Sequence, residues 1–454
     1  MLKSLPCETS RFCKRTIIIE EEINMLNKNF LNLKALWLGN DKKAWKKFIK
    51  KLLRKKNLKG LNEVFKRLNC LRRWTSVTSD SRYNELNKQA LNSVIAYVLA
   101  SYAQDKGYTI KWELFPKIAL YRSFQKTYVN YDTKEHTIEE ICALKNIPLS
   151  AFDSAVKEFI EESTNKEFSD FITDGILGSF EMTIYKAATK IATLVELQEI
   201  SHLIIKDSEI YTRKLLEILE SIEEFKYIPG VTEFSDMDGN YFKLFSEISK
   251  LRNQNRWAVQ PYLINCSVLG HLFDTAIFAY LIGIEYFKDN ERLAAKMFFI
   301  GIFHDIAERW TNDIPSPIKN KIKGFREAIN EYERIVLEKN VYSQLPKFMG
   351  KAIRTVMIEE EVNAFLHKFM KGADYLSADA ECWRQYDAGS RDTYFFTSAI
   401  MGFQMHLWKK DYILPKNCQK LHKYYFRYAR KSIKWSIAHC AISYIINYAF
   451  QAKN

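Results

Sequence analysis

The sequence predicts an all-α protein. Apolar residues recur at helical spacing through almost the whole chain of 454 residues, whereas alternating, strand-like segments are nearly absent beyond TIIIEEE near residue 16. Glycine (15) and proline (9) are scarce, which argues against collagen-like and turn-rich β architectures. Because 47% of the residues are hydrophobic, the chain can bury a large core, and wholesale disorder is not expected.

Residues 1–60 are predicted to form a basic helical extension. The net charge is +14, and the first 80 residues hold 20 Lys/Arg against 7 Asp/Glu, so the remainder is about neutral. Segment 42–59 alternates basic and apolar residues at helical spacing, which predicts a basic amphipathic helix. Such a helix suits an anionic partner, either nucleic acid or a membrane surface, or an acidic protein groove. Alternatively, its apolar stripe packs on its own protein and its lysines are solvated.

The remaining chain contains two similar series of helical motifs. In the second half they are LRNQNRW (251–257), GHLFDTAIFAYLIG (270–283), FFIGIFHDIAERWTND (298–313) and KGADYLSADAEC (371–382). In the first half they are CLRRW (70–74), NKQALNSVIAYVLA (87–100), PKIALYRSFQKTYVNYD (116–132) and KAATKIATLVEL (186–197). Arg256 precedes His271 by 15 residues, and Arg73 precedes Lys88 by 15 residues. The order and spacing predict an internal repeat.

This repeat divides the chain into three parts. We expect the basic extension at 1–60, a first helical repeat at 61–235, and a second repeat with a helical tail at 236–454. The competing interpretation is that amphipathic helices resemble one another by chance. If the repeat is genuine, the two copies are expected to pair with each other within the chain.

Cysteine usage and hydropathy indicate a cytoplasmic protein without a transmembrane segment. The eight cysteines form no CxxC pair and mostly lie in apolar patterns, as reduced cysteines do. The N-terminus lacks the apolar region of a signal peptide. The apolar stretches near 273–287 and 436–450 are interrupted by Asp274, Glu285 and His439, so neither predicts a membrane span.

The second repeat carries a predicted metal centre. Its apolar helical segments contain two histidines and two aspartates: His271, His304, Asp305 and Asp374. A buried carboxylate needs a compensating charge, and a divalent cation supplies one. This mixed nitrogen and oxygen ligand set suits one Mn, Co, Fe or Ni ion, with Mg or Zn as alternatives. Glu308 follows His304 by four residues, so it is predicted on the same helix face, where it could polarise a water or protonate a leaving group.

The sequence HDIAERWTNDIPSPIK (304–319) resembles the HDxxExxxGDxPxPxK signature of the HD-domain phosphohydrolases. Within that superfamily it is most similar to the bacterial HD-domain 5′-deoxynucleotidases. The resemblance covers roughly 250–390, about a third of the chain. It includes the Arg256-Trp257 pair upstream of the first histidine and a KGADYLSADAEC segment like the family's ADxLsAxxEC. The extended motif with the RW pair is fairly specific, whereas an isolated HD dipeptide is a weak signal.

The resemblance implies a role for each matching residue. The four predicted ligands would coordinate one divalent metal ion, and Glu308 would orient or activate the attacking water. Arg256 would grip the phosphate, as a guanidinium fork can. Trp257 would shape the sugar site, which in the family disfavours ribonucleotides. Asp313 would lie at the phosphate and sugar side of the pocket, and 314–317 would form the rigid loop after the HD helix.

The chain also departs from the family pattern. The family usually has EHS around the first histidine, whereas this chain has Gly270-His271-Leu272, and the glycine of GD is Asn312. The missing glutamate removes an expected partner that would orient the metal-binding histidine.

The first repeat replaces the predicted ligands with other residues. Lys88, Arg122, Ser123 and Thr189 stand at the ligand positions, and Lys126 matches Glu308. Cations at these positions would repel a metal ion. Arg73-Trp74 nevertheless persist. The first repeat is therefore either an inactive scaffold or an anion pocket that binds a phosphate without hydrolysing it. The predicted members of this anion pocket are Arg73, Lys88, Arg122 and Lys126.

Together these observations predict a metal-dependent phosphohydrolase that removes the 5′-phosphate of deoxynucleoside monophosphates or a similar nucleotide. One alternative is another HD-type activity: a nucleoside triphosphate hydrolase, a cyclic-nucleotide phosphodiesterase or a nuclease. A second alternative is a non-catalytic nucleotide sensor or nucleic-acid-binding protein on the same scaffold.

Overall fold

The computed structural model describes residues 50–75, 82–129, 135–204, 208–257, 262–287, 290–312, 321–357 and 364–390, and positions 314, 319, 414, 418 and 419. These residues form sixteen α-helices and two short 3-10 helices, with no strand among them. The predicted all-α class is confirmed. Residues 1–49, Asp313, 315–317 and nearly all of the predicted C-terminal tail lie outside the described residues.

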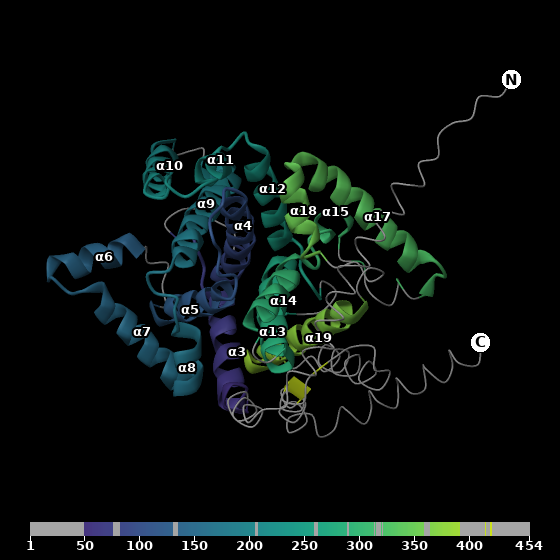
Figure 1. Ribbon diagram of the computed structural model, residues 1–454, viewed down its shortest axis with the longest axis horizontal. Helices are drawn as coiled ribbons and strands as arrows, with labels where there is room; N and C mark the ends of the chain where they lie inside the picture. Colours follow the sequence, from purple (N-terminus) through teal and green to yellow (C-terminus); the bar gives the residue numbers. More distant parts are fainter. Residues whose placement is uncertain are drawn as a thin grey trace. The chain divides into compact units, whose positions relative to one another are not determined.

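The chain divides into two compact units, Met1–Lys51 and Leu52–Asn454, and the helices described below belong to the second. The first eight are α3 (Lys55–Cys70), α4 (Glu85–Asp105), α5 (Leu114–Val129), α6 (Glu135–Leu144), α7 (Leu149–Ser163), α8 (Lys166–Thr173), α9 (Phe180–Ile204) and α10 (Ser208–Glu223) (Figure 1). They are followed by α11 (Val231–Ser235), α12 (Asn240–Ser249), η1 (Lys250–Asn253), α13 (Val268–Phe287), α14 (Glu291–Phe303), α15 (Glu308–Thr311), α17 (Phe325–Asn340), η2 (Tyr342–Gln344), α18 (Lys347–Arg354) and α19 (Ala364–Asp387).

Two helices that are buried on nearly all sides form the core. In α4, 18 of 21 residues are buried, and they include polar side chains that belong to the ion network described below. Helix α4 packs against α9, α13 packs against α14 and α19, and α4 and α13 contact each other. Among the described helices, α13 alone has the length and hydropathy of a membrane span, and 94% of that stretch is buried inside the protein.

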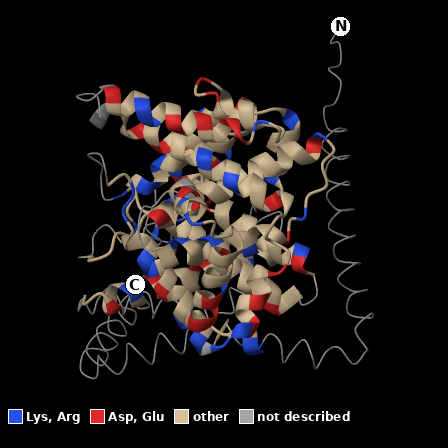
Figure 2. Cartoon of the chain, turned by 90° about the vertical axis from the view of Figure 1, so that its left-hand side faces the viewer, with Lys and Arg blue, Asp and Glu red and all other residues tan. Residues whose placement is uncertain are grey.

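The predicted basic helix at 42–59 is interrupted within its described part. The backbone leaves the helical conformation at Leu53 and Arg54, and α3 begins at Lys55. The Asn57 side chain donates a 2.8 Å hydrogen bond to the carbonyl of Leu52, which satisfies a carbonyl group that a continuous helix would have paired internally. Beyond the basic N-terminal region, Lys/Arg and Asp/Glu are interspersed over the described helices (Figure 2).

An unusual backbone arrangement occurs twice, 183 positions apart. Isolated antiparallel bridges join Arg72 to Asn84 and Asn255 to Ser267. The tryptophan that follows each RW arginine has a φ of 60°, at positions 74 and 257. A left-handed conformation is uncommon for a bulky residue, so its recurrence at matching positions is not a general property of amphipathic helices.

Candidate active site

The predicted metal ligands come from three helical segments of the second half. Helix α13 carries His271, the chain directly after α14 carries His304-Asp305, and α19 carries Asp374. His271, His304 and Asp305 each offer a ligand atom, and these atoms lie within 4.8 Å of one another. Asp374 adjoins them, because its Oδ1 lies 3.1 Å from Nε2 of His271. The fold therefore brings together the four side chains that the sequence analysis selected.

The surroundings of His304 fit a bound cation. Its Nδ1 lies 2.7 Å from the carbonyl of Gly301, which can accept the imidazole proton. The other nitrogen, Nε2, is buried and makes no hydrogen bond of acceptable geometry with the described residues. Nevertheless, Nε2 lies only 2.9 Å from Oδ2 of Asp305. Either a proton on Nε2 or a cation between the two atoms would compensate this contact, and a divalent ion with mixed N/O ligands would supply the second.

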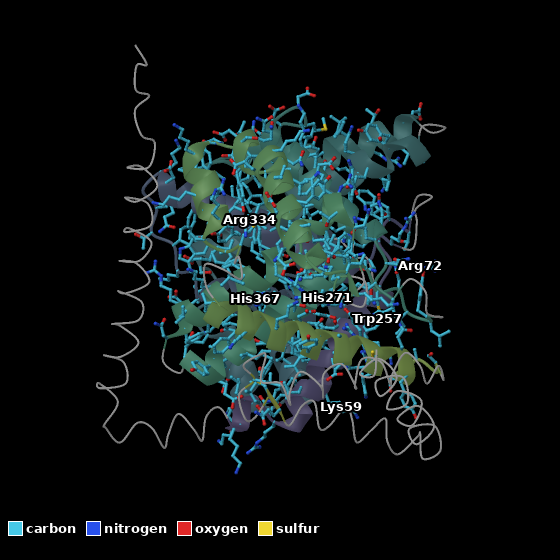
Figure 3. All side chains as sticks on the ribbon, turned by 90° about the vertical axis from the view of Figure 1, so that its right-hand side faces the viewer. Lys59, Arg72, Trp257, His271, Arg334 and His367 are labelled. Atoms are coloured by element: carbon cyan, nitrogen blue, oxygen red, sulfur yellow. The ribbon has the colours of Figure 1, made fainter. Side chains whose placement is uncertain are left out.

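Glu381 on α19 connects the predicted metal, phosphate and sugar residues. Its Oε1 lies 2.9 Å from Nδ1 of His271. Its Oε2 accepts a 2.8 Å hydrogen bond from the Trp257 indole and lies 3.3 Å from Nε of Arg256. Figure 3 shows His271 and Trp257 close together beside α19. The carboxylate fixes the imidazole so that Nε2 faces Asp374 and the metal position, which is how carboxylates commonly orient metal-binding histidines.

The sequence analysis missed this role of Glu381. The available signal was its position seven residues after Asp374, which places both carboxylates on one face of α19. Glu381 is the glutamate of the segment that resembles ADxLsAxxEC, and it orients His271 from α19 although Gly270 stands where the family usually has a glutamate.

The electrostatics of the site keep its carboxylates ionised. Burial would raise the pKa of Glu381, but the positive charges of Arg256 and His271 outweigh burial and lower it to about 2. Burial likewise opposes ionisation of Asp374, whose pKa is nevertheless held well below its ordinary value by Lys371 and His271. Burial and Arg256 oppose protonation of His271, while the carboxylates around it raise its pKa to about 9. The site is therefore a pocket of ionised oxygens in which a cation is favoured.

Glu308 lies close to the HD pair, but not on the same continuous helix. Helix α14 ends at Phe303, residues 304–307 form turns, and α15 begins at Glu308. The backbone tightens here, because the amide of Glu308 donates to the carbonyl of Asp305, three residues earlier. The prediction of a shared helix face is therefore wrong, although Glu308 is buried and only 7% exposed.

In the first half, Arg73 and Lys88 belong to a buried ion network centred on Glu196. Oε2 of Glu196 lies 3.0 Å from Nε of Arg73 and 3.6 Å from Nζ of Lys88. Arg252 approaches Oε1 of the same carboxylate at 3.2 Å, and Arg73 also pairs with Glu85 at 3.0 Å. Burial would raise the pKa of Glu196, but these cations lower it to about 2. Two members of the predicted anion pocket are thus already engaged with carboxylates.

Trp74 also has its contacts within the fold. Its indole donates a 3.1 Å hydrogen bond to Oε2 of Glu196, as Trp257 does to Glu381. Helix α10 covers it, since Tyr211, Leu215 and neighbouring residues pack against the cluster that contains Trp74. The other two members of the predicted anion pocket, Arg122 and Lys126, line a separate pocket that is described below.

Comparison with known proteins agrees with the geometry. Residues 243–411 match the family described as 5′-deoxynucleotidase YfbR-like. A 5′-deoxynucleotidase of Yersinia pestis (strain Pestoides F) and one of Yersinia pseudotuberculosis (serotype O:1b, strain IP 31758) are each 26% identical over 150 residues. These alignments cover 33% of this chain and 76% of each relative. The predicted resemblance to the HD-domain 5′-deoxynucleotidases is confirmed for the C-terminal half.

We expect Glu381→Gln to weaken metal binding about 10- to 100-fold, because the amide cannot hold His271 and Arg256 electrostatically as the carboxylate does. The measurement is a competition titration of Mn²⁺ or Co²⁺ against a chelating dye. Glu181→Gln is the matched control, because Glu181 is also buried and accepts a hydrogen bond from the amide of Lys111. Glu181 lies on α9, far from the proposed ligands in sequence. Equal metal affinities in the Glu381 variant and the wild type would contradict the assignment.

Proposed function

We propose that the protein is a metal-dependent phosphohydrolase that removes the 5′-phosphate of deoxynucleoside monophosphates or a similar nucleotide. The observation that carries the proposal is the cluster of His271, His304 and Asp305, whose ligand atoms lie within 4.8 Å of one another beside Asp374. The match of the C-terminal half to the 5′-deoxynucleotidases supports the choice of substrate class.

A divalent ion held by these side chains would supply Lewis-acid polarisation of the phosphoryl group and of the attacking water. Arg256 would bind the phosphate, because its Nη2 lies 4.0 Å from Oδ1 of Asp374 and its Nε is held by Glu381. Trp257, hydrogen-bonded to the same glutamate, would lie against the sugar. Glu308 is the candidate general base or acid, since it is a buried carboxylate one turn beyond His304.

The decisive measurement is a phosphate-release screen of deoxynucleoside monophosphates, ribonucleoside monophosphates and deoxynucleoside triphosphates with Mn²⁺, Co²⁺, Mg²⁺ and Zn²⁺. We expect inorganic phosphate from the deoxynucleoside monophosphates, and complete loss of its release when a chelator removes the metal. Release of triphosphate, or cleavage of a cyclic nucleotide or single-stranded DNA, would select the alternative HD activities. Absence of any reaction with all four metals would contradict the proposal.

We also propose that the Leu52–Asn454 unit contains two copies of one helical fold, of which only the second keeps the metal ligands. The Glu196 network in the first half parallels the Glu381 network in the second: each glutamate binds the arginine and the tryptophan of an RW pair. The backbone supports the same correspondence, because Arg73 donates to Tyr83 at 2.8 Å and Arg256 donates to Cys266 at 2.7 Å. These contacts depend on particular side chains and not on helical periodicity.

The packing of the helices supports a paired arrangement of the two copies. Helix α4 contacts α9 and α13 contacts α19, which are the corresponding pairs in each copy, and α4 contacts α13 across the copies. Arg252 reaches Glu196 in the first copy, while Asn69 donates to the carbonyl of Asn265 in the second. Positions 69 and 252 are again 183 residues apart, so the same position in each proposed copy contacts the other copy, although the two partners differ.

A further inference from the structure

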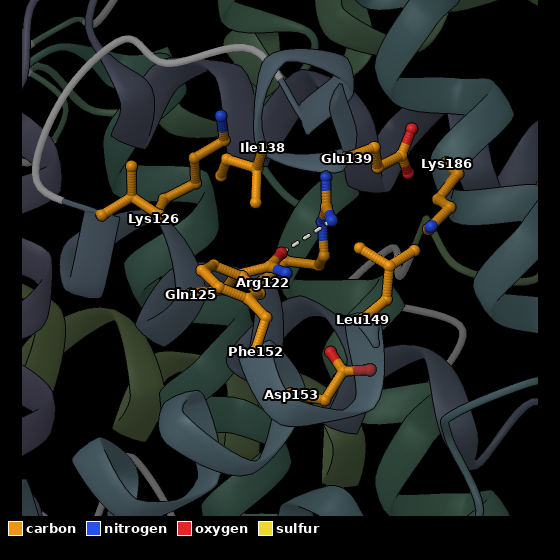
Figure 4. A pocket seen from close by; sticks show the side chains of 10 residues that line it. Arg122, Gln125, Lys126, Ile138, Glu139, Leu149, Phe152, Asp153 and Lys186 are labelled. Carbon is orange, nitrogen blue, oxygen red and sulfur yellow. Dashed lines mark hydrogen bonds between the residues drawn. The ribbon is translucent and has the colours of Figure 1, made fainter. Parts of the chain in front are cut away.

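We propose that the first half binds a phosphate group in a pocket between α5, α6, α7 and α9, which includes Arg122, the residue matched to His304 in the aligned motifs. The pocket is lined by Arg122, Gln125, Lys126, Val129, Ile138, Glu139, Leu149, Phe152, Asp153 and Lys186. Figure 4 shows the Arg122 guanidinium at its centre, with Lys126 and Lys186 on opposite sides. The inference concerns binding only and does not depend on the proposed catalytic activity.

Two cations of this pocket stand at positions matched to proposed site residues of the second half, and the third is matched to a lysine beside that site. Arg122 matches the first residue of the HD pair and Lys126 matches Glu308 in the aligned motifs. Lys186 begins KAATKIATLVEL as Lys371 begins KGADYLSADAEC, and Lys371 lies 3.3 Å from Asp374. The first half therefore has a positive charge in place of His304 and of Glu308, and it shares a lysine at the third position. Cations of this kind are suited to binding a phosphate group.

The buried guanidinium is the strongest element of the pocket. Arg122 is only 3% exposed, and its Nη1 donates a 2.7 Å hydrogen bond to Oε1 of Gln125. A guanidinium presents five donors in a planar fork, and this geometry matches phosphate oxygens. A phosphate in the pocket would gain charge-assisted hydrogen bonds in surroundings that are partly shielded from water.

The balance of charge in the pocket favours an anion, although two carboxylates oppose it. Arg122, Lys126 and Lys186 contribute three positive charges, and Glu139 and Asp153 contribute two negative ones. Asp153 already accepts a 2.6 Å hydrogen bond from the Tyr121 hydroxyl, which partly satisfies its charge. Lys126 also acts inward, because its charge adds to burial and Arg73 in lowering the pKa of Lys88 to about 7, against the opposing charges of Glu196 and Glu85.

The size of the pocket indicates which part of a ligand it holds. The volume of the pocket is about 80 Å³, whereas pockets that bury most of a drug-sized ligand measure roughly 300–1,000 Å³. A phosphate group fits such a pocket, and the remainder of a phosphate monoester would extend outward. Leu149, which is 48% exposed, and Phe152 line the same pocket and offer apolar contact to the sugar or base of a nucleotide. Inorganic phosphate and a nucleoside monophosphate are therefore the two sources to compare.

The test measures binding without turnover. The full chain with Asp305→Asn, in excess chelator, is titrated calorimetrically with inorganic phosphate and separately with dAMP. Lys126→Ala/Lys186→Ala in this background is compared with Lys145→Ala/Lys166→Ala, which removes two exposed lysines of the first half that do not line the pocket. We expect the pocket variant to bind phosphate at least about 10-fold more weakly and the control variant to be unchanged. Thermal unfolding establishes that both variants are folded.

We expect a second variant to change phosphate affinity in the opposite direction. Asp153→Asn removes one opposing negative charge from the pocket, so it should tighten phosphate binding at low ionic strength. Stronger binding of dAMP than of phosphate would identify a nucleotide as the ligand, and equal binding would identify free phosphate. Absence of binding in the Asp305→Asn background, or binding that Lys126→Ala/Lys186→Ala leaves unchanged, overturns the inference.

Discussion

Asp305→Asn is expected to reduce phosphate release by at least about 10³-fold and to abolish stoichiometric binding of the divalent ion. The amide is a far weaker metal ligand than the carboxylate, and it leaves His304 without the charged oxygen that lies 2.9 Å from Nε2. Because the change conserves side-chain volume, the loss should be chemical and not a consequence of unfolding. Phosphate release and metal content after dialysis are the two measurements.

The control for this prediction is Asp238→Asn, the same substitution at an exposed aspartate in the turn before α12. It should keep full phosphate release and full metal content. If Asp305→Asn lost activity but retained one tightly bound metal per chain, the ligand assignment would fail while a catalytic role for Asp305 remained. If it retained activity, the proposed function itself would be contradicted.

Glu196→Gln is expected to lower the free energy of unfolding by about 3–5 kcal/mol, which is the usual effect of removing one partner from a buried ion pair. The substitution leaves Arg73, Lys88 and Arg252 around a neutral amide, and the Arg252 side chain is fully buried. Urea denaturation followed by circular dichroism measures the change, with the slope of the transition checked for two-state behaviour.

Two further variants show whether the loss comes from uncompensated charge. Glu63→Gln removes the partner of Arg67 in a largely exposed pair, and we expect it to cost less than about 1 kcal/mol. Lys88→Met in the Glu196→Gln background should restore part of the stability, because it removes one of the buried cations that the amide cannot compensate. A destabilisation below 1 kcal/mol for Glu196→Gln would show that the network contributes little to the fold.

The sequence analysis selected the proposed metal ligands because their chemistry conflicts with their surroundings. A histidine or an aspartate within an apolar helical segment needs a reason to be there, and His271 and Asp374 each stand out on that ground. Residue spacing was a less reliable guide to helix continuity between His304 and Glu308. Helix α14 ends at Phe303 and turns follow at 304–307, and helical periodicity does not report where that helix ends.

The role of Glu381 required the tertiary structure. A glutamate in a helix is ordinarily a solvated residue, and only the approach of α13 to α19 shows that it binds His271. The same holds for Glu196, which contacts cations that are distant in sequence. Arg73 lies 123 residues before it, and Arg252 lies 56 residues after it. Such pairings depend on how helices cross, and no local pattern encodes that geometry.

The sequence alone determined the helical class, the resemblance of the C-terminal half to the HD-domain 5′-deoxynucleotidases and which four side chains we propose as metal ligands. These properties follow from local periodicity and from the cost of burying polar groups, and both can be evaluated residue by residue. Only the tertiary structure showed that the four cations of the predicted anion pocket belong to two different places in the fold. Arg73 and Lys88 are neutralised by Glu85 and Glu196, whereas Arg122 lines a pocket with Lys126 and Lys186. The physical reason is that electrostatic interaction depends on distance in space, and the folded helices set that distance.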